Sequence, residues 1–170
     1  MIKARSFCFL GAIILLASIQ SCIGFGYTLK GGTIPGKSFS IENFDNVAPL
    51  GNPALSITVQ DLLRDRLLKE TSLTSVSSDG DANFVGTVVN YTITPVVGTG
   101  ATTVSLNRLT ISLKVTYTNS VNDKNDFTKT ISNFDDFDSS MDIASEEEAL
   151  IKTIGEKLVT QIFNEVLIDW

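Results

Sequence analysis

The segment from Leu106 to Asn119 constrains the fold more than any other part of the chain, because its apolar and polar residues alternate along its length. Successive side chains of a strand point to opposite faces, so this pattern predicts a long strand with one buried and one wetted face. The buried set is Leu109, Ile111, Leu113, Val115 and Tyr117, and the wetted set is Thr110, Ser112, Lys114, Thr116 and Thr118. A sheet with one apolar face has to bury it against a second layer.

Two segments have the spacing of amphipathic helices and can supply that layer. Residues 54–71 place an apolar side chain at every third or fourth position, directly after Asn52 and Pro53, which suit an N-cap and the first helical position. Residues 145–166 repeat the spacing, and Ser145 opens them with the pattern of a capping box.

The remaining β-type segments complete the predicted fold. Alternation or enrichment in β-branched and aromatic residues predicts strands at residues 37–44, 84–95 and 127–134. The expected order is β-α-β-β-β-α. We therefore expect an α+β, two-layer sandwich, with two helices packed on one face of a four-stranded, mostly antiparallel sheet. Three polar segments between these elements are interpreted as loops: residues 45–53, 71–83 and 135–144.

The N-terminus has the pattern of a targeting segment. Lys3 and Arg5 precede an apolar run at residues 7–17, and small residues follow, as in a secretory signal. The segment Ile19–Cys22 resembles the lipobox that the bacterial lipoprotein signal peptidase cleaves. We expect a lipoprotein signal peptide at residues 1–21 and diacylglycerol and N-acyl chains on Cys22, which would anchor the chain to a membrane.

Two other interpretations of the N-terminus stay open. The charge-free stretch could be a permanent membrane-spanning helix, although Gln20, Gly24 and Gly26 interrupt its apolar character. Cys22 could also be a structural thiol. With the signal-peptide interpretation, residues 22–36 form a lipidated, Gly-rich leading segment and residues 37–170 form a single domain.

Composition excludes several classes of function. The chain contains no histidine, which excludes Ser-His-Asp triads, Cys-His pairs and imidazole metal sites. Its two cysteines cannot form a four-cysteine zinc site. The net charge of −6 argues against a general nucleic-acid-binding surface. No P-loop, dinucleotide fingerprint or nucleophile elbow is present, so we expect a protein that is not an enzyme.

The acidic segment from Asp135 to Asp142 partly resembles a calcium-binding loop. Counted from Asp136, carboxylates fall at some of the ligand positions of an EF-hand loop, but Met141 occupies the position that requires glycine. Solvated acidic turns are the better interpretation, and we expect neither a metal nor a cofactor. A hydrolase that uses unplaced carboxylates is not excluded by spacing alone.

Several short strings, taken with the lipobox and the order of elements, resemble the LptE family of lipopolysaccharide-assembly lipoproteins. These strings are Tyr27–Gly31, Ala48–Leu50 with Asn52–Pro53, Leu106–Thr110, Phe137–Ser140 and the terminal Trp170. The resemblance covers residues 22–170 and carries no catalytic signature.

The resemblance implies a lipid-anchored protein on the periplasmic side of the outer membrane. LptE-like proteins sit as a plug inside a large β-barrel of the LptD type, help it to fold, and together with it insert lipopolysaccharide into the outer leaflet. Relatives contact lipid phosphates through basic residues, for which Arg108 and Lys114 are candidates here. The polar face of residues 106–119 could then dock inside the barrel, or could simply be an ordinary wet sheet face. The alternative is an unrelated periplasmic adaptor or a small-ligand-binding module.

Overall fold

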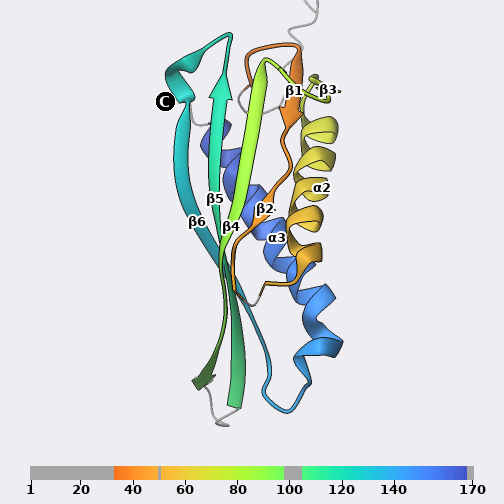
Figure 1. Cartoon of the computed structure of the whole chain (residues 1–170), viewed down its shortest axis with the longest axis vertical. Helices are drawn as coiled ribbons and strands as arrows, with labels where there is room; N and C mark the ends of the chain where they lie inside the picture. The colour runs from red at the N-terminus through yellow and green to blue at the C-terminus, as the bar shows by residue number, and fades with distance from the viewer. Residues whose placement is uncertain (1–32, 50, 98–104, 168–170) are drawn as a thin grey trace, which may run out of the picture.

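The computed structural model describes residues 33–49, 51–97 and 105–167. Two helices and a mixed sheet make up this part of the chain, which confirms the expected α+β class (Figure 1). In chain order the elements are β1 (Ser38–Ile41), β2 (Asp45–Asn46), α2 (Pro53–Glu70), β3 (Thr74–Val76), β4 (Ala82–Val97), β5 (Ser105–Asn119), the 3-10 helix η2 (Asp123–Asn125), β6 (Phe127–Asp138) and α3 (Ile143–Leu167).

The sheet combines antiparallel and parallel pairing. Its strand order is β3-β1-β4-β5-β6, and β2 pairs with β4 farther along that strand. The long strands β4, β5 and β6 are antiparallel neighbours, whereas β1 runs parallel to both β3 and β4. The expectation of four mostly antiparallel strands in the chain order β-α-β-β-β-α is therefore wrong in detail, because the described residues form a mixed sheet of six strands, with β2 and β3 added to the expected order.

The two unexpected strands have a physical explanation. β2 has two residues and β3 has three, so neither is long enough to show alternation in the sequence. Their extended conformation depends on backbone pairing with β4 and β1, which are distant in sequence. The parallel pairing follows from α2, because a crossover helix returns the chain so that the strands on either side of it run in the same direction.

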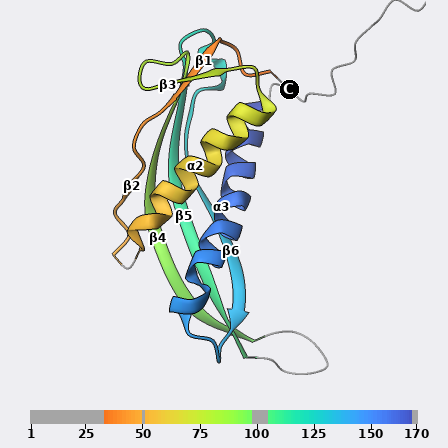
Figure 2. The ribbon, with the colours of Figure 1, turned by 90° about the vertical axis from the view of Figure 1, so that its right-hand side faces the viewer.

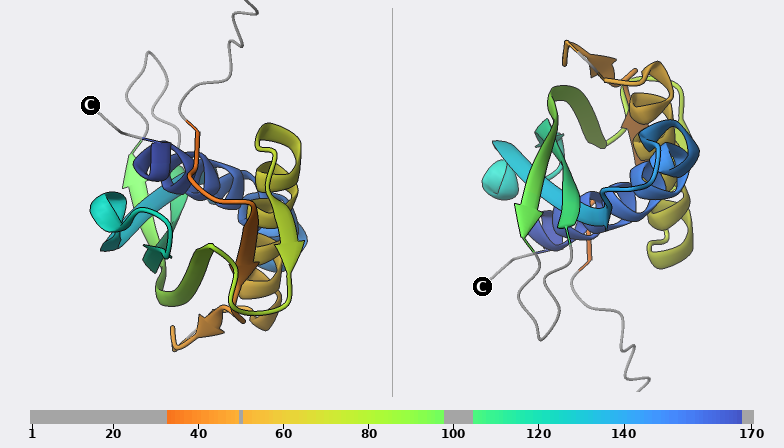
Figure 3. Two further views of the ribbon diagram at one scale, coloured as in Figure 1. Left: turned by 90° about the horizontal axis from the view of Figure 1, so that it is seen from above. Right: turned by 90° about the horizontal axis from the view of Figure 1, so that it is seen from below.

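Both helices lie on one face of the sheet and pack against each other (Figure 2). Viewed along the long axis, β1 and β3 lie near α2, while β5 and β6 lie near α3 (Figure 3). In α2 the predicted N-cap is confirmed, since Asn52 Oδ1 accepts a hydrogen bond from the Ala54 amide at 2.9 Å. Among the described residues, no helix combines the length and the apolar character needed to cross a bilayer.

The acidic segment at residues 135–144, which the sequence predicts to be a loop, is partly strand and partly helix. β6 continues to Asp138, so its first residues lie in a strand. The helix begins at Ile143, and Asp142 caps it by accepting a hydrogen bond from the Ala144 amide at 3.2 Å. The capping role predicted for Ser145 is therefore wrong, because Ser145 already lies inside the first turn.

The core between the sheet and the helices confirms the predicted faces. Leu109, Ile111, Leu113 and Val115 of β5 are fully buried, and Tyr117 is 1% exposed. Along α3 the buried stripe includes Ile154, Leu158 and Ile162, as its spacing predicts.

A β-bulge and a glycine adapt β4 to this core. The register of β4 against β5 shifts between Val88 and Asn90, which lets both Val88 and Tyr91 point toward the helices. Gly86 leaves room for the buried ring of Phe44, since a Cβ at position 86 would lie 2.5 Å from that ring. A glycine inside a strand commonly marks such a close approach.

Candidate functional site

The face of the sheet that points away from the helices is the candidate functional surface, here called the open face. Its side chains come from three long neighbouring strands whose register aligns them in rows. These rows are Val85, Thr116 and Thr128; Thr87, Lys114 and Thr130; Asn90, Ser112 and Ser132; Thr92, Thr110 and Phe134; and Thr94, Arg108 and Asp136. Most of the side chains are hydroxyls or amides, so the open face is wettable but carries little charge.

Hydroxyl pairs hold neighbouring strands of the open face together. Ser132 donates to Ser112 at 2.8 Å, and the hydroxyls of Thr116 and Thr128 lie 3.0 Å apart. Cross-strand pairs of this kind stabilise a sheet without requiring a covering layer. The hydroxyls therefore make the open face a rigid polar surface. Its contacts with water can be replaced by contacts with another polar surface.

Lys114 stands in the middle of the open face. It lies between Thr87 of β4 and Thr130 of β6 in the register, and it is exposed. None of the ion pairs formed among the described residues involves Lys114. Its ammonium group is thus available to an anionic group on another molecule.

Arg108, the second candidate cation, is occupied within the domain. Its Nε and Nη2 donate to the two carboxylate oxygens of Asp136 at 2.7 and 2.9 Å, and its guanidinium lies 3.7 Å from the centre of the Phe134 ring. The hydrogen bond with Arg108 lowers the pKa of Asp136, and the same bond raises the pKa of Arg108. This pair neutralises itself, so Arg108 is a weaker candidate than Lys114 for binding an anion.

The structure places both candidate cations on one face but not in one site. They are six positions apart along β5, which corresponds to about 20 Å in a strand. The cysteine predicted to carry the lipid, Cys22, lies outside the described residues. Arg108 and Lys114 are therefore separate contact points on a long surface.

The acidic residues around the end of β6 have partners within the domain. Asp136 binds Arg108, Asp138 accepts hydrogen bonds from the amide and the hydroxyl of Ser140, and Asp142 caps α3. These contacts explain the acidic composition of the segment. In the described ranges, no group of three or more carboxylate, thiol or imidazole side chains could hold a metal ion.

A contact that the sequence did not reveal joins the beginnings of the two helices to β4. Glu147 of α3 accepts a hydrogen bond from the side-chain amide of Asn52 at 2.9 Å and another from the Tyr91 hydroxyl at 2.7 Å. Burial and the hydrogen bond to Glu147 raise the pKa of Tyr91, so the phenol keeps its proton and remains a donor. Because the three residues are far apart in the chain, no local pattern could have indicated this contact.

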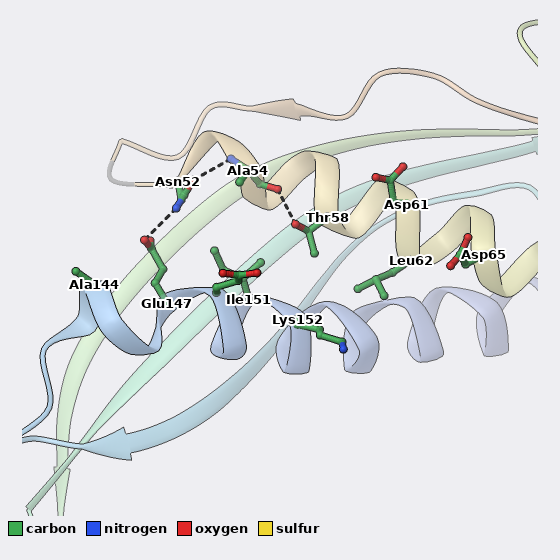
Figure 4. A pocket seen from close by; sticks show the side chains of 11 residues that line it. Asn52, Ala54, Thr58, Asp61, Leu62, Asp65, Ala144, Glu147, Ile151 and Lys152 are labelled. Atoms are coloured by element: carbon green, nitrogen blue, oxygen red, sulfur yellow. Dashed lines mark hydrogen bonds between the residues drawn. The ribbon is translucent and has the colours of Figure 1, made fainter.

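Glu147 also borders an open groove between α2 and α3, with a volume of about 610 Å³ (Figure 4). The groove is acidic, and Figure 4 shows Glu147 directed across its end toward Asn52. The other residues that line it are Ala54, Thr58, Asp61, Leu62, Asp65, Ala144, Glu148, Ile151 and Lys152. The groove is a surface between two helices and not an enclosed ligand cavity.

We expect Glu147→Ala to destabilise the domain by about 1–3 kcal/mol, because it leaves the Asn52 amide and the partly buried Tyr91 hydroxyl without their acceptor. Urea unfolding would measure this loss. Glu148→Ala is the matched control, since Glu148 is an exposed neighbour in the same helix. Equal losses in the two variants would contradict the clamping role.

Comparison with protein families gives one match that covers most of the chain. A family model described as LptE, lipopolysaccharide-assembly, matches residues 36–166. The matched range contains every helix and strand of the structure apart from the last residue of α3. No curated protein matches the chain.

Solved structures with TM-scores above 0.5 share this fold at low sequence identity, and others are more distantly similar. Protein XCC0632 from Xanthomonas campestris is 13% identical, with a TM-score of 0.55 over 80% of this chain and 86% of that chain. The hypothetical protein CT253 from Chlamydia trachomatis is 8% identical, with a TM-score of 0.56 over 78% and 96%. A minor lipoprotein from Acinetobacter baumannii is 18% identical, with a TM-score of 0.44 over 77% and 92%.

Proposed function

The chain belongs to the LptE family of lipopolysaccharide-assembly proteins, and from this premise we propose that it is a lipoprotein that plugs a lipopolysaccharide-translocating β-barrel of the LptD type. It acts without catalysis and without a cofactor. It is held by the lipid on Cys22 at the periplasmic side of the outer membrane. It helps the barrel to assemble, and the two proteins together insert lipopolysaccharide into the outer leaflet.

The observation that carries this proposal is the open face. One face of β4, β5 and β6 is covered by the helices, while the other is wide, polar and nearly free of uncompensated charge. The lumen of an outer-membrane barrel is polar, and its lipid-facing side is apolar. A plug therefore needs a wettable outer surface around an independent core, and the open face meets that requirement.

Charge distribution supports a local contact with lipopolysaccharide. The chain as a whole is acidic, with a net charge of −6, so it has no general attraction for an anionic lipid. On the open face, by contrast, Lys114 has no partner among the described residues, and the charges of Arg108 and Asp136 compensate each other. We propose that Lys114 contacts either a lipid phosphate or an acidic group of the barrel wall.

Thr116→Glu should weaken the complex with the barrel, because it places a charge in the middle of the docking surface while the core behind it stays intact. Purification in mild detergent, followed by mass spectrometry, would measure how much barrel is recovered with each variant. Thr74→Glu is the control, since it makes the same change at an exposed position of β3.

Depletion of the protein should lower the amount of assembled barrel and the amount of lipopolysaccharide at the cell surface.

The contrary outcome would be normal surface lipopolysaccharide in depleted cells and no barrel in the purified sample. A periplasmic adaptor or a small-ligand-binding module would then replace the plug. An intermediate outcome also decides a part of the proposal. If Lys114→Ala leaves barrel recovery unchanged but lowers binding of lipopolysaccharide, the lysine contacts the lipid and not the barrel wall.

A further inference from the structure

The strand β6 ends the sheet on one side, and among the described residues no other strand pairs with its outer side. The amide of Ser139, just after β6, donates to the Ser105 carbonyl of β5 at 3.3 Å, which sets the phase of the ladder. Odd-numbered residues of β6 therefore bond to β5, and even-numbered residues direct their backbone N–H and C=O groups outward. A long strand with such an outer side can pair with strands of other molecules unless something prevents it.

One row of polar side chains on α3 contacts this margin. Lys157, Gln161 and Glu165 follow one another at intervals of four positions, so they lie on one face of the helix. Lys157 donates to the backbone carbonyl of Phe134 at 2.9 Å and pairs with the Asp135 carboxylate at 3.0 Å. The Phe134 carbonyl belongs to the outward set, so Lys157 occupies an acceptor that a foreign strand would use.

The other two members of the row continue along the strand in the opposite chain direction. Gln161 accepts a hydrogen bond from the side-chain amide of Asn133 at 3.0 Å. Glu165 pairs with Lys129 near the beginning of β6. The three contacts thus extend along the margin from residue 135 back to residue 129, and they join three successive turns of α3 to it.

The position of the row points to a role other than holding the helix in place. The buried stripe of α3, which includes Ile154, Leu158 and Ile162, already packs the helix on the sheet. Partly exposed polar pairs at the side of that stripe add little to folding stability. They do, however, lie where a further strand would have to approach β6.

We propose that Lys157, Gln161 and Glu165, here called the edge guard, keep β6 from pairing with a strand of another molecule. Proline and bulges commonly protect an edge strand, but β6 has no proline and no register shift against β5. The edge guard takes their place. It acts independently of the plug function, since docking through the open face leaves it intact.

Removing the edge guard exposes the margin without touching the core. The variant combines Lys157→Ala, Gln161→Ala and Glu165→Ala in the full chain, purified from membranes in mild detergent. We expect it to self-associate at a concentration about tenfold lower than the wild-type chain, the change that three partly exposed polar contacts can produce. Native mass spectrometry over a dilution series would measure this shift.

A matched control removes the same kinds of side chain from other exposed positions of α3. It combines Lys152→Ala, Glu156→Ala and Asn164→Ala. Among the described residues none of these three side chains bonds to β6, so the control should associate no more than the wild-type chain. Both triple variants keep the apolar stripe, and urea unfolding should give similar midpoints for the two.

Residue-resolved hydrogen exchange identifies the surface through which the variant without the edge guard associates. The outward amides of Thr130 and Ser132 should become protected as its concentration rises, whereas the Ile131 amide, which already bonds to β5, should not change. Adding Ser132→Pro should return this variant to the single chain, because proline removes an outward amide that β5 does not use.

Two results would overturn the proposal. One is a variant without the edge guard that stays single wherever the control stays single. The other is association that leaves the outward amides of β6 unprotected, since another surface would then be responsible. The exchange measurement decides between β6 and other surfaces even where the proline variant does not fold.

Discussion

Leu158→Ala is expected to lower the free energy of unfolding by about 2–5 kcal/mol, the range found when a large buried side chain is truncated. Leu158 is fully buried in the middle of the apolar stripe of α3, which faces the sheet. Alanine removes its apolar area from the core and leaves a cavity that the rigid long strands cannot fill. Leu113→Ala should have a similar effect from the sheet side of the same core, since Leu113 is also fully buried.

The control for both core variants lies on the opposite face of β5. Thr116 is partly exposed, and within the described part of the chain its hydroxyl bonds to Thr128 alone, so Thr116→Ala should cost about 1 kcal/mol or less. Urea unfolding with an unchanged slope would measure all three variants on one scale. Equal losses at positions 113, 116 and 158 would contradict the placement of Leu113 and Leu158 in the core and of Thr116 on the open face.

Cys22→Ala is expected to abolish lipid modification, because the thiol is the atom that receives diacylglycerol. The proposed cleavage before Cys22 depends on that modification, so the variant should remain as unprocessed precursor or appear as soluble protein. Two or more acyl chains hold a protein stably at a membrane, whereas a protein without acyl chains has no lipid anchor. The expected loss of the lipid anchor is therefore complete.

Intact-mass measurement of the membrane-extracted protein would test the anchor directly. The wild-type chain should begin at Cys22 and carry the mass of its acyl chains. Cys8→Ala is the matched control, because Cys8 lies within the proposed signal peptide and should not affect the mature mass. An unmodified Cys22 in the wild-type protein would refute the lipobox interpretation and leave the structural thiol or the membrane-spanning helix.

The predictions that succeeded concern features encoded by neighbouring residues. The alternation in β5, the stripe of α3 and the Asn52 cap each depend on a few positions along the chain, and the structure contains all three. Alternation also predicts Lys114 on the wetted face of β5, whereas Arg108 became a candidate only through the family resemblance. The sequence did not predict the pairing of Arg108 with Asp136, because that partner lies on another strand.

Contacts between distant segments decided the rest, and they had no signal in any local window. The short strands β2 and β3 are extended because longer strands pair with them, so their own residues did not predict them. Glu147 meets Asn52 and Tyr91 only after both helices pack on the sheet. The sequence by itself thus determined which faces are apolar and which elements form, since burial and propensity act residue by residue. Only the tertiary structure decided strand order and the partner of each charge, since these depend on which distant surfaces bury one another.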